Sequence, residues 1–207
     1  MTYPTFEEEK YLWKQGFTHI AGVDEVGRGC FAGPVVTAAV ILPPHFRSPK
    51  PVNDSKVLSA AIRRELAQVI KQQAIAFSIS EVSVAVINKL GIAKATQQSF
   101  REAIKLLTKK PDFILMDAFY IQRLSRKIQK PIIHGDGISI SIAAASIIAK
   151  VYRDDLMQKL HQTYKQYDFF SNKGYGTKKH QEAIKKYGLT KLHRTSFNLT
   201  KFLNNPA

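Results

Sequence analysis

Residues 19–42 read HIAGVDEVGRGCFAGPVVTAAVIL, and this stretch decides the fold. His19 to Val26 is apolar except for two acids near its end, which predicts a strand. Val35 to Leu42 is a continuous apolar, β-branched run, typical of a strand that is covered on both faces. The glycine-containing segment 27–34 between them resembles a hairpin connection. The sequence therefore predicts two paired strands at the start of the core.

The rest of the chain alternates helical and strand patterns. Apolar spacing predicts helices after Ser59, at about Ala93 to Lys109, at about Ser139 to Tyr164 and at Lys178 to Tyr187, and strands at Ala74 to Val82, Phe113 to Asp117 and Pro131 to Ile133. This order favours an α/β sandwich with a mixed central sheet. We expect one unit with an N-terminal segment (1–18), a core domain (19–166) and a basic helical extension (167–207).

The chain is strongly basic. Its 207 residues hold 31 Lys and Arg against 16 Asp and Glu, a formal charge of +15. Residues 150–207 hold twelve of these cations and four acids. Any single lysine is better explained as a solvated helix face, but the sum favours a polyanionic partner such as nucleic acid.

Composition also bears on where the protein works. No apolar run approaches the length of a membrane span, and the acidic Glu7 to Glu9 is unlike the start of a secretory signal, so we expect a cytoplasmic protein. Cys30 is the single cysteine and is expected to be a small buried residue, because it has no partner for a disulfide or a zinc site. Nothing in the sequence demands a dimer, and we expect a monomer.

Four carboxylates stand where an apolar strand ends or a helix begins: Asp24, Glu25, Asp117 and Asp136. Taken singly, each has a structural explanation, since Asp24 and Glu25 could be an exposed strand end, Asp117 a turn residue and Asp136 a helix cap. Together in a basic protein they would make an oxygen-rich pocket that suits two Mg²⁺ or Mn²⁺ ions.

Seven short motifs occur in a fixed order along the chain, and together they point to a known family. They are DEVGRG (24–29) with GPVV (33–36), DSKVL (54–58), FILMD (113–117), HGD (134–136), SIAAASIIAKVYRD (141–154), GYGTKKH (174–180) and HRTSF (193–197). In this order they resemble bacterial ribonuclease HII, a type 2 ribonuclease H, over about residues 19–198. Ordered motifs of this number carry far less risk of a chance match than any one of them.

The resemblance implies a ribonuclease H-like αβα sandwich with a mixed five-stranded sheet and a helical C-terminal extension. It implies an endoribonuclease that cuts the RNA strand of RNA/DNA hybrids, and 5′ of ribonucleotides embedded in duplex DNA, with Mn²⁺ or Mg²⁺. We expect two-metal-ion catalysis that leaves 5′-phosphate and 3′-hydroxyl ends.

The resemblance also assigns roles to residues. The four carboxylates become the catalytic, metal-binding set. Gly27, Arg28 and Gly29 would contact the ribose 2′-hydroxyl mainly through the main chain, and Tyr175 would pack on the neighbouring deoxyribose. Without the resemblance, Tyr175 reads better as a core residue in a turn. Lys56, Arg194 and Ser55 resemble phosphate contacts, although each alone is more often a surface residue.

Some positions depart from the family pattern. Ala118 and Gly137 replace the usual glycine and serine and are small enough to preserve the site. Gly91 stands where an asparagine commonly faces the minor groove, which puts that contact in doubt. His134, His180 and His193 lack metal-ligand spacing, and we assign none of them to catalysis.

Three alternatives stay open at this point. A ribonuclease HIII would carry a large N-terminal domain, for which a first strand at His19 leaves no room. A non-catalytic nucleic-acid-binding protein would use the same basic surface, and a DNA-junction nuclease would need no sensor of the 2′-hydroxyl.

Overall fold

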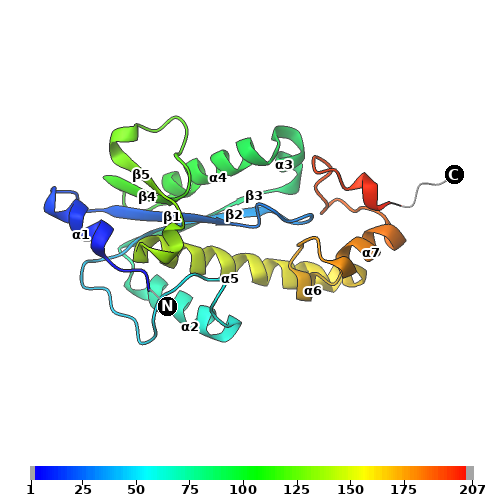
Figure 1. The fold of residues 1–207 in the computed structure, drawn as a ribbon, viewed down its shortest axis with the longest axis horizontal. Coiled ribbons are helices and arrows are strands. Elements are labelled where there is room, and N and C mark those ends of the chain that lie inside the picture. Colours follow the sequence, from blue (N-terminus) through cyan, green and yellow to red (C-terminus); the bar gives the residue numbers. More distant parts are fainter. Residues whose placement is uncertain (1–2, 204–207) are drawn as a thin grey trace.

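A five-stranded sheet forms the centre of the molecule, and the computed structural model describes residues 3–203 (Figure 1). The strands are β1 (Ile20–Val26), β2 (Val35–Ile41), β3 (Ala76–Val82), β4 (Phe113–Asp117) and β5 (Gln129–Ile132). Their order is β3-β2-β1-β4-β5. The β3–β2 and β2–β1 pairs are antiparallel, and the β1–β4 and β4–β5 pairs are parallel. The expected mixed sheet is confirmed.

Helices cover both faces of this sheet. They are α1 (Glu7–Lys14), α2 (Ala60–Gln73), α3 (Val84–Leu90), α4 (Ile92–Leu106), α5 (Ile140–Thr163), α6 (Phe169–Asn172) and α7 (Lys178–Tyr187). Helices α2 and α5 lie on one face, and α3 and α4 on the other (Figure 1). Alternate residues of β2 feed the two cores: Val36 and Val40 pack towards α2 and α5, and Ile41 packs with Phe100 of α4. The αβα sandwich is confirmed.

Helix α5 packs directly on β1. Its N-cap is Ser139, whose hydroxyl oxygen accepts a 3.2 Å hydrogen bond from the N–H of Ile142. Small and apolar residues from Ser141 to Ala149 are buried along the first turns. Gly22 permits this approach, because a Cβ there would lie 2.1 Å from the carbonyl carbon of Ser141. The helix therefore runs close beside the strand that carries Asp24.

Helix α1 and helix α3 were not predicted. In α1, Leu12 joins a buried cluster with Ile20 and Phe113. Glu9 is buried and accepts hydrogen bonds from the Ser139 hydroxyl at 2.6 Å and from the Ser141 N–H at 3.1 Å. These contacts come from residues about 130 positions away, so the local pattern gave little sign of them.

The C-terminal extension is helical, as expected, and packs against the end of α5. It contains the one-turn helices η3 (Lys165–Tyr167) and η4 (Thr200–Phe202) besides α6 and α7. Met157 of α5 shares a buried cluster with Tyr167, Phe169 and Ile184. Among the described residues, every helix is too short or too polar to cross a membrane.

Candidate active site

The strand ends bring the four predicted carboxylates into one region of the molecule. Asp24 and Glu25 lie near the end of β1, and Asp117 is the last residue of β4. Since β1 and β4 are parallel neighbours, these ends lie at the same edge of the sheet. Asp136 lies in η2 (Gly135–Gly137), the one-turn helix that follows β5, the neighbour of β4.

Asp24 and Glu25 line one cavity although they are adjacent on a strand. Adjacent side chains point to opposite faces of a sheet, and here both sit at the strand end, where each still reaches the cavity. The cavity measures about 260 Å³. Its lining consists of Asp24, Glu25, Val26, Gly27, Arg28, Gly29, Ser55, Lys56, Asp117, Ser146, Lys150 and Tyr175. A larger hollow of about 550 Å³ lies between α7 and η4, but it is lined mainly by lysine, amide and apolar side chains.

Burial and mutual repulsion disfavour the charged forms of Asp24, Glu25 and Asp117. Burial raises the pKa of Asp24 well above its ordinary value, and the charges of Glu25, Asp117 and Asp136 raise it further. Burial likewise raises the pKa of Glu25 to about 7, against the opposing charges of Arg28 and Lys56. The pKa of Asp117 is raised by burial and by Asp136, although the Gly135 N–H donates it a 2.8 Å hydrogen bond.

Lys56 supplies a positive charge at the edge of this cluster. Its ammonium donates a 3.0 Å hydrogen bond to Asp136 Oδ2 and lies 3.6 Å from Asp54 Oδ1. Burial lowers the pKa of Lys56, but the bond to Asp136 and the charges of Asp136 and Asp54 raise it by more. The side chain is 73% exposed, so it can reach solvent and the acids alike.

The four acids fit a hard divalent cation in ligand type and in charge. Mg²⁺ and Mn²⁺ prefer carboxylate oxygens, and a cation would relieve the repulsion that raises the pKa of Asp24. Within residues 3–203, no three Asp, Glu, His or Cys side chains converge closely enough to hold an ion as they stand. The carboxylate side chains therefore have to rotate before they can share an ion. Asp136 would also have to exchange its hydrogen bond to Lys56 for a bond to that ion.

A glycine-containing loop borders the acids. Gly27 has a φ of 94°, and a Cβ there would lie 2.1 Å from Nε of Arg153. Gly29 has nothing within 4 Å of the same position, so its main chain is open on that side. Arg28 extends between them and stacks 4.6 Å from the ring centroid of Phe119. The loop thus presents bare main chain beside the carboxylates.

A model of the family described as Ribonuclease HII matches residues 21–200. The chain belongs to the ribonuclease HII family. A ribonuclease HII of Syntrophus aciditrophicus is 48% identical over 195 residues, which cover 94% of this chain and 90% of that protein. One of Oceanobacillus iheyensis is 50% identical over 202 residues, covering 97% and 76%. The chain is therefore an enzyme of the ribonuclease H class.

Solved structures share the ribonuclease HII fold. Ribonuclease H2 from Pyrococcus horikoshii superposes with a TM-score of 0.74 at 25% identity, covering 89% of this chain and 96% of that one. A ribonuclease HIII in complex with Mn²⁺ superposes with a TM-score of 0.64 at 20% identity, over 89% of this chain and 68% of that one. The second likeness concerns the fold alone.

The structure corrects one expectation that the ribonuclease HII motifs suggested. Arg194 was expected to contact phosphate, but it is completely buried. Its guanidinium donates to the main-chain oxygens of Arg28 at 2.8 Å, Gly33 at 2.8 and 3.0 Å, and Pro34 at 3.2 Å. With its donors used inside the protein, Arg194 holds the glycine-containing loop and does not face solvent.

Arg153 was not singled out and holds the same loop from α5. It is also completely buried, and donates to Pro34 O at 3.1 Å, Ala32 O at 3.2 Å and Lys173 O at 2.9 Å. The two buried guanidinium groups thus provide hydrogen-bond donors for main-chain oxygens of the loop, which lie outside the strands and helices.

Tyr175 lines the cavity and is 41% exposed, so it is not the core tyrosine of the alternative reading. Lys150 lies 5.9 Å from its ring centroid. The main-chain oxygen of Tyr175 accepts a 2.9 Å hydrogen bond from Nδ1 of His180, and His180 Nε2 lies 3.1 Å from His193 Nε2. The N–H of Thr190 donates to His193 Nδ1 at 3.0 Å, so both histidines are neutral links in a buried chain.

Ser55 and Lys56 reach the cavity in different ways. Ser55 is buried, and its hydroxyl shares a 2.9 Å hydrogen bond with that of Ser146, which lines the same cavity as Asp24. Lys56 is exposed beside it. Ser146 and Lys150 were missed, although their spacing of four on a predicted helix would have put them on one face with each other.

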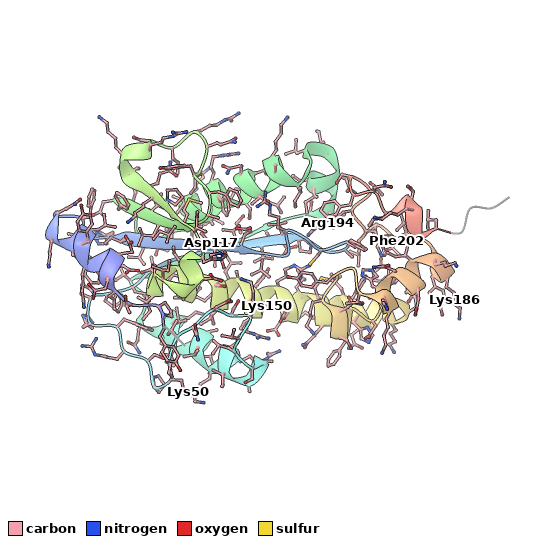
Figure 2. All side chains as sticks on the ribbon, in the orientation of Figure 1. Lys50, Asp117, Lys150, Lys186, Arg194 and Phe202 are labelled. Carbon is pink, nitrogen blue, oxygen red and sulfur yellow. The ribbon has the colours of Figure 1, made fainter. Side chains whose placement is uncertain are left out.

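Figure 2 shows Asp117 and Lys150 near the middle of the molecule, and Lys186 and Phe202 at the end with the C-terminal helices.

Proposed function

We propose that this protein is an endoribonuclease that hydrolyses the RNA strand of RNA/DNA hybrids and cuts 5′ of ribonucleotides embedded in duplex DNA. One observation carries the proposal: the cavity of about 260 Å³ combines three of the family's acids with a glycine-containing loop, and the fourth acid is bonded to its lysine. Acids alone would suit many hydrolases. The adjoining bare main chain adds a means of sensing a 2′-hydroxyl.

Asp24, Glu25, Asp117 and Asp136 would hold Mn²⁺ or Mg²⁺. Two bound ions would supply an activated water and neutralise the leaving 3′-oxygen, which gives 5′-phosphate and 3′-hydroxyl ends. The residues of the chain do the rest. The carboxylates would hold the ions in place, and the Lys56 ammonium would exchange its bond to Asp136 for one to a phosphate oxygen.

Selection of ribose would come from the loop and from Tyr175. Main-chain groups of Gly27, Arg28 and Gly29 can approach a sugar closely because two of the three lack a side chain. Tyr175 would pack on the next deoxyribose, with its position fixed by the bond from His180 to its carbonyl. Arg194 and Arg153 keep the loop in place, so they act as positioning residues.

The overall charge of +15 supports duplex nucleic acid as the partner, through phosphate contacts along the basic extension. We further propose that the protein acts as a cytoplasmic monomer, with 19–166 as catalytic domain and 167–207 as an extension of the same unit. Light scattering during size exclusion would measure the mass, and a dimer would contradict the monomer.

The decisive experiment compares duplexes with one, four or no ribonucleotides in Mg²⁺, Mn²⁺ or EDTA. Cleavage should need both a ribonucleotide and a divalent ion, and should leave the all-DNA duplex intact. Asp24→Asn and Asp117→Asn should abolish cleavage and retain binding. Binding without any metal-dependent product would instead support the non-catalytic alternative, and cleavage of the all-DNA duplex would support a junction nuclease.

A further inference from the structure

The loop that follows Asp117 exposes two aromatic rings close to the carboxylate cavity. Phe119 is 43% exposed and Tyr120 is 41% exposed. Ala118 turns the chain with a left-handed φ of 61°, so the rings leave the line of β4. The loop lies on the α4 side of the sheet (Figure 1). Exposed aromatic side chains that stand together often mark a binding surface.

An arginine side chain lies over each of the two rings. The guanidinium carbon of Arg28 lies 4.6 Å from the centroid of Phe119, and that of Arg126 lies 4.9 Å from the centroid of Tyr120. Arg28 also lines the carboxylate cavity, which makes the two surfaces continuous. Residues 118–130 hold four Lys or Arg and no acid. Apart from the carboxylates of the adjoining cavity, the charges that this loop contributes are all positive, so its aromatic surface is complementary to a polyanion.

Two glutamines hold this loop in one conformation without using the rings. Gln97 of α4 donates to Tyr120 O at 2.9 Å and accepts from the N–H of Gln122 at 2.7 Å. The buried Gln129 accepts from the N–H of Ile121 at 2.8 Å and donates to the oxygens of Ile121 and Leu124 at 3.1 and 3.0 Å. The rings are thus displayed by a fixed main chain, at little further cost of ordering on binding.

A hollow of about 200 Å³ lies beside the first ring. Phe100 and Phe119 contribute its apolar part, and Arg28 and Lys94 its charges. An apolar floor with cations around it matches the sugar and phosphate groups of a nucleic-acid backbone.

We propose that the loop of residues 118–126 is a second contact surface for duplex nucleic acid, which binds the flank of the duplex next to the cleavage site. Phe119 and Tyr120 pack on sugars, while Arg28 and Arg126 neutralise phosphates. The contact does not depend on base sequence or on a ribonucleotide. The inference rests on the proposed function only in taking the same class of duplex.

The test measures binding in EDTA, by fluorescence anisotropy, to an RNA/DNA hybrid and to an all-DNA duplex. The double variant Phe119→Ala/Tyr120→Ala should weaken binding to both duplexes by at least about fivefold. Phe119→Leu/Tyr120→Leu keeps apolar volume and should lose affinity nearly as much, which separates ring contacts from folding defects. The matched control is Phe77→Ala, another exposed phenylalanine with a lysine, Lys71, 5.7 Å from its ring, on the edge strand at the opposite side of the sheet.

Shortened duplexes locate the contact. Removing base pairs from one flank should weaken binding by the wild-type protein, because the shortened duplex no longer reaches the loop. The affinity of the double variant should not change, because that variant has already lost the same contact. Arg126→Gln should reduce the slope of affinity against salt by about one ion. Unchanged binding by both double variants, or equal sensitivity of wild type and variants to each shortened flank, would overturn the proposal. The two proposals can fail separately. If the wild-type protein cleaves none of the duplexes but the double variants still bind more weakly, the contact surface is supported and the proposed function is contradicted.

Discussion

Arg194 donates a 2.8 Å hydrogen bond from Nη1 to the main-chain oxygen of Arg28, a residue 166 positions earlier in the chain. The same guanidinium bonds Gly33 and Pro34, so the C-terminal extension holds both ends of the loop that would sense ribose. A buried cation that no described acid pairs with stays charged here because carbonyl dipoles surround it. The extension is thus tied to the site by these hydrogen bonds.

Replacing Arg194 by lysine should therefore lower stability and loosen ribose selection. A lysine ammonium cannot reproduce the planar fan of bonds, so we expect a loss of about 2–4 kcal/mol in the free energy of unfolding. Urea denaturation measures the stability, and cleavage of single-ribonucleotide duplexes should fall mainly in kcat. The control is Arg64→Lys, whose side chain is 51% exposed beside Asp155. A stable Arg194→Lys protein with normal cleavage would contradict the positioning role.

These contacts mark where sequence reasoning ends. Residues 19–42 and α7 were predictable because their signals are local. Apolar runs form the two paired strands. Helix α7 begins after Thr177, whose hydroxyl oxygen accepts a 3.3 Å hydrogen bond from the His180 N–H, and ends at Gly188, which has a φ of 77°. The four carboxylates were predictable as residues at element ends. Arg194 was assigned to phosphate by the family resemblance, and only the tertiary fold shows that it is buried and bonded to main-chain oxygens.

The histidine chain predicts a loss of stability in acid. Burial, together with His180, lowers the pKa of His193 from 6.5 to about 4. The unfolded chain therefore binds more protons than the folded one between these values, so stability is full above about 6.5 and falls as the pH drops towards 4. The slope from this residue is at most about 1.4 kcal/mol per pH unit. Urea midpoints from pH 4 to 7.5 measure it.

His193→Gln should flatten that slope because the substituted side chain does not titrate. His45→Gln is the control, since His45 is exposed in the loop after β2. An identical pH dependence in the His193 variant and the wild type would show that other groups control acid unfolding.

The crowded acids predict that removing a charge stabilises the metal-free protein. The folded-state pKa of Asp24 is raised, so its ionised form destabilises the fold at pH values above that pKa, and the effect vanishes below about 3.8. In EDTA at pH 8, Asp24→Asn should raise the free energy of unfolding while cleavage is lost, and the gain should shrink as the pH falls.

Asp112→Asn provides a control of opposite sign. Asp112 accepts hydrogen bonds from the N–H groups of Thr18 at 2.8 Å and His19 at 3.0 Å, and its pKa is lowered despite some burial. Its substitution should destabilise the protein modestly and leave cleavage intact. If both variants were destabilised equally, the charges at the ends of β1 and β4 would not be in conflict.

The two glycines of the loop separate folding from ribose sensing. Gly27→Ala would strain a φ of 94° and set a methyl group 2.1 Å from the Arg153 side chain, so it should cost about 2 kcal/mol or more of stability together with activity. Gly29→Ala meets nothing within 4 Å in the free protein and should melt like the wild type. It should nevertheless lose most cleavage at a single ribonucleotide, because the added methyl would occupy the space that the sugar needs. A Gly29→Ala enzyme with full stability and undiminished cleavage would mean that the ribose does not approach this side of the loop.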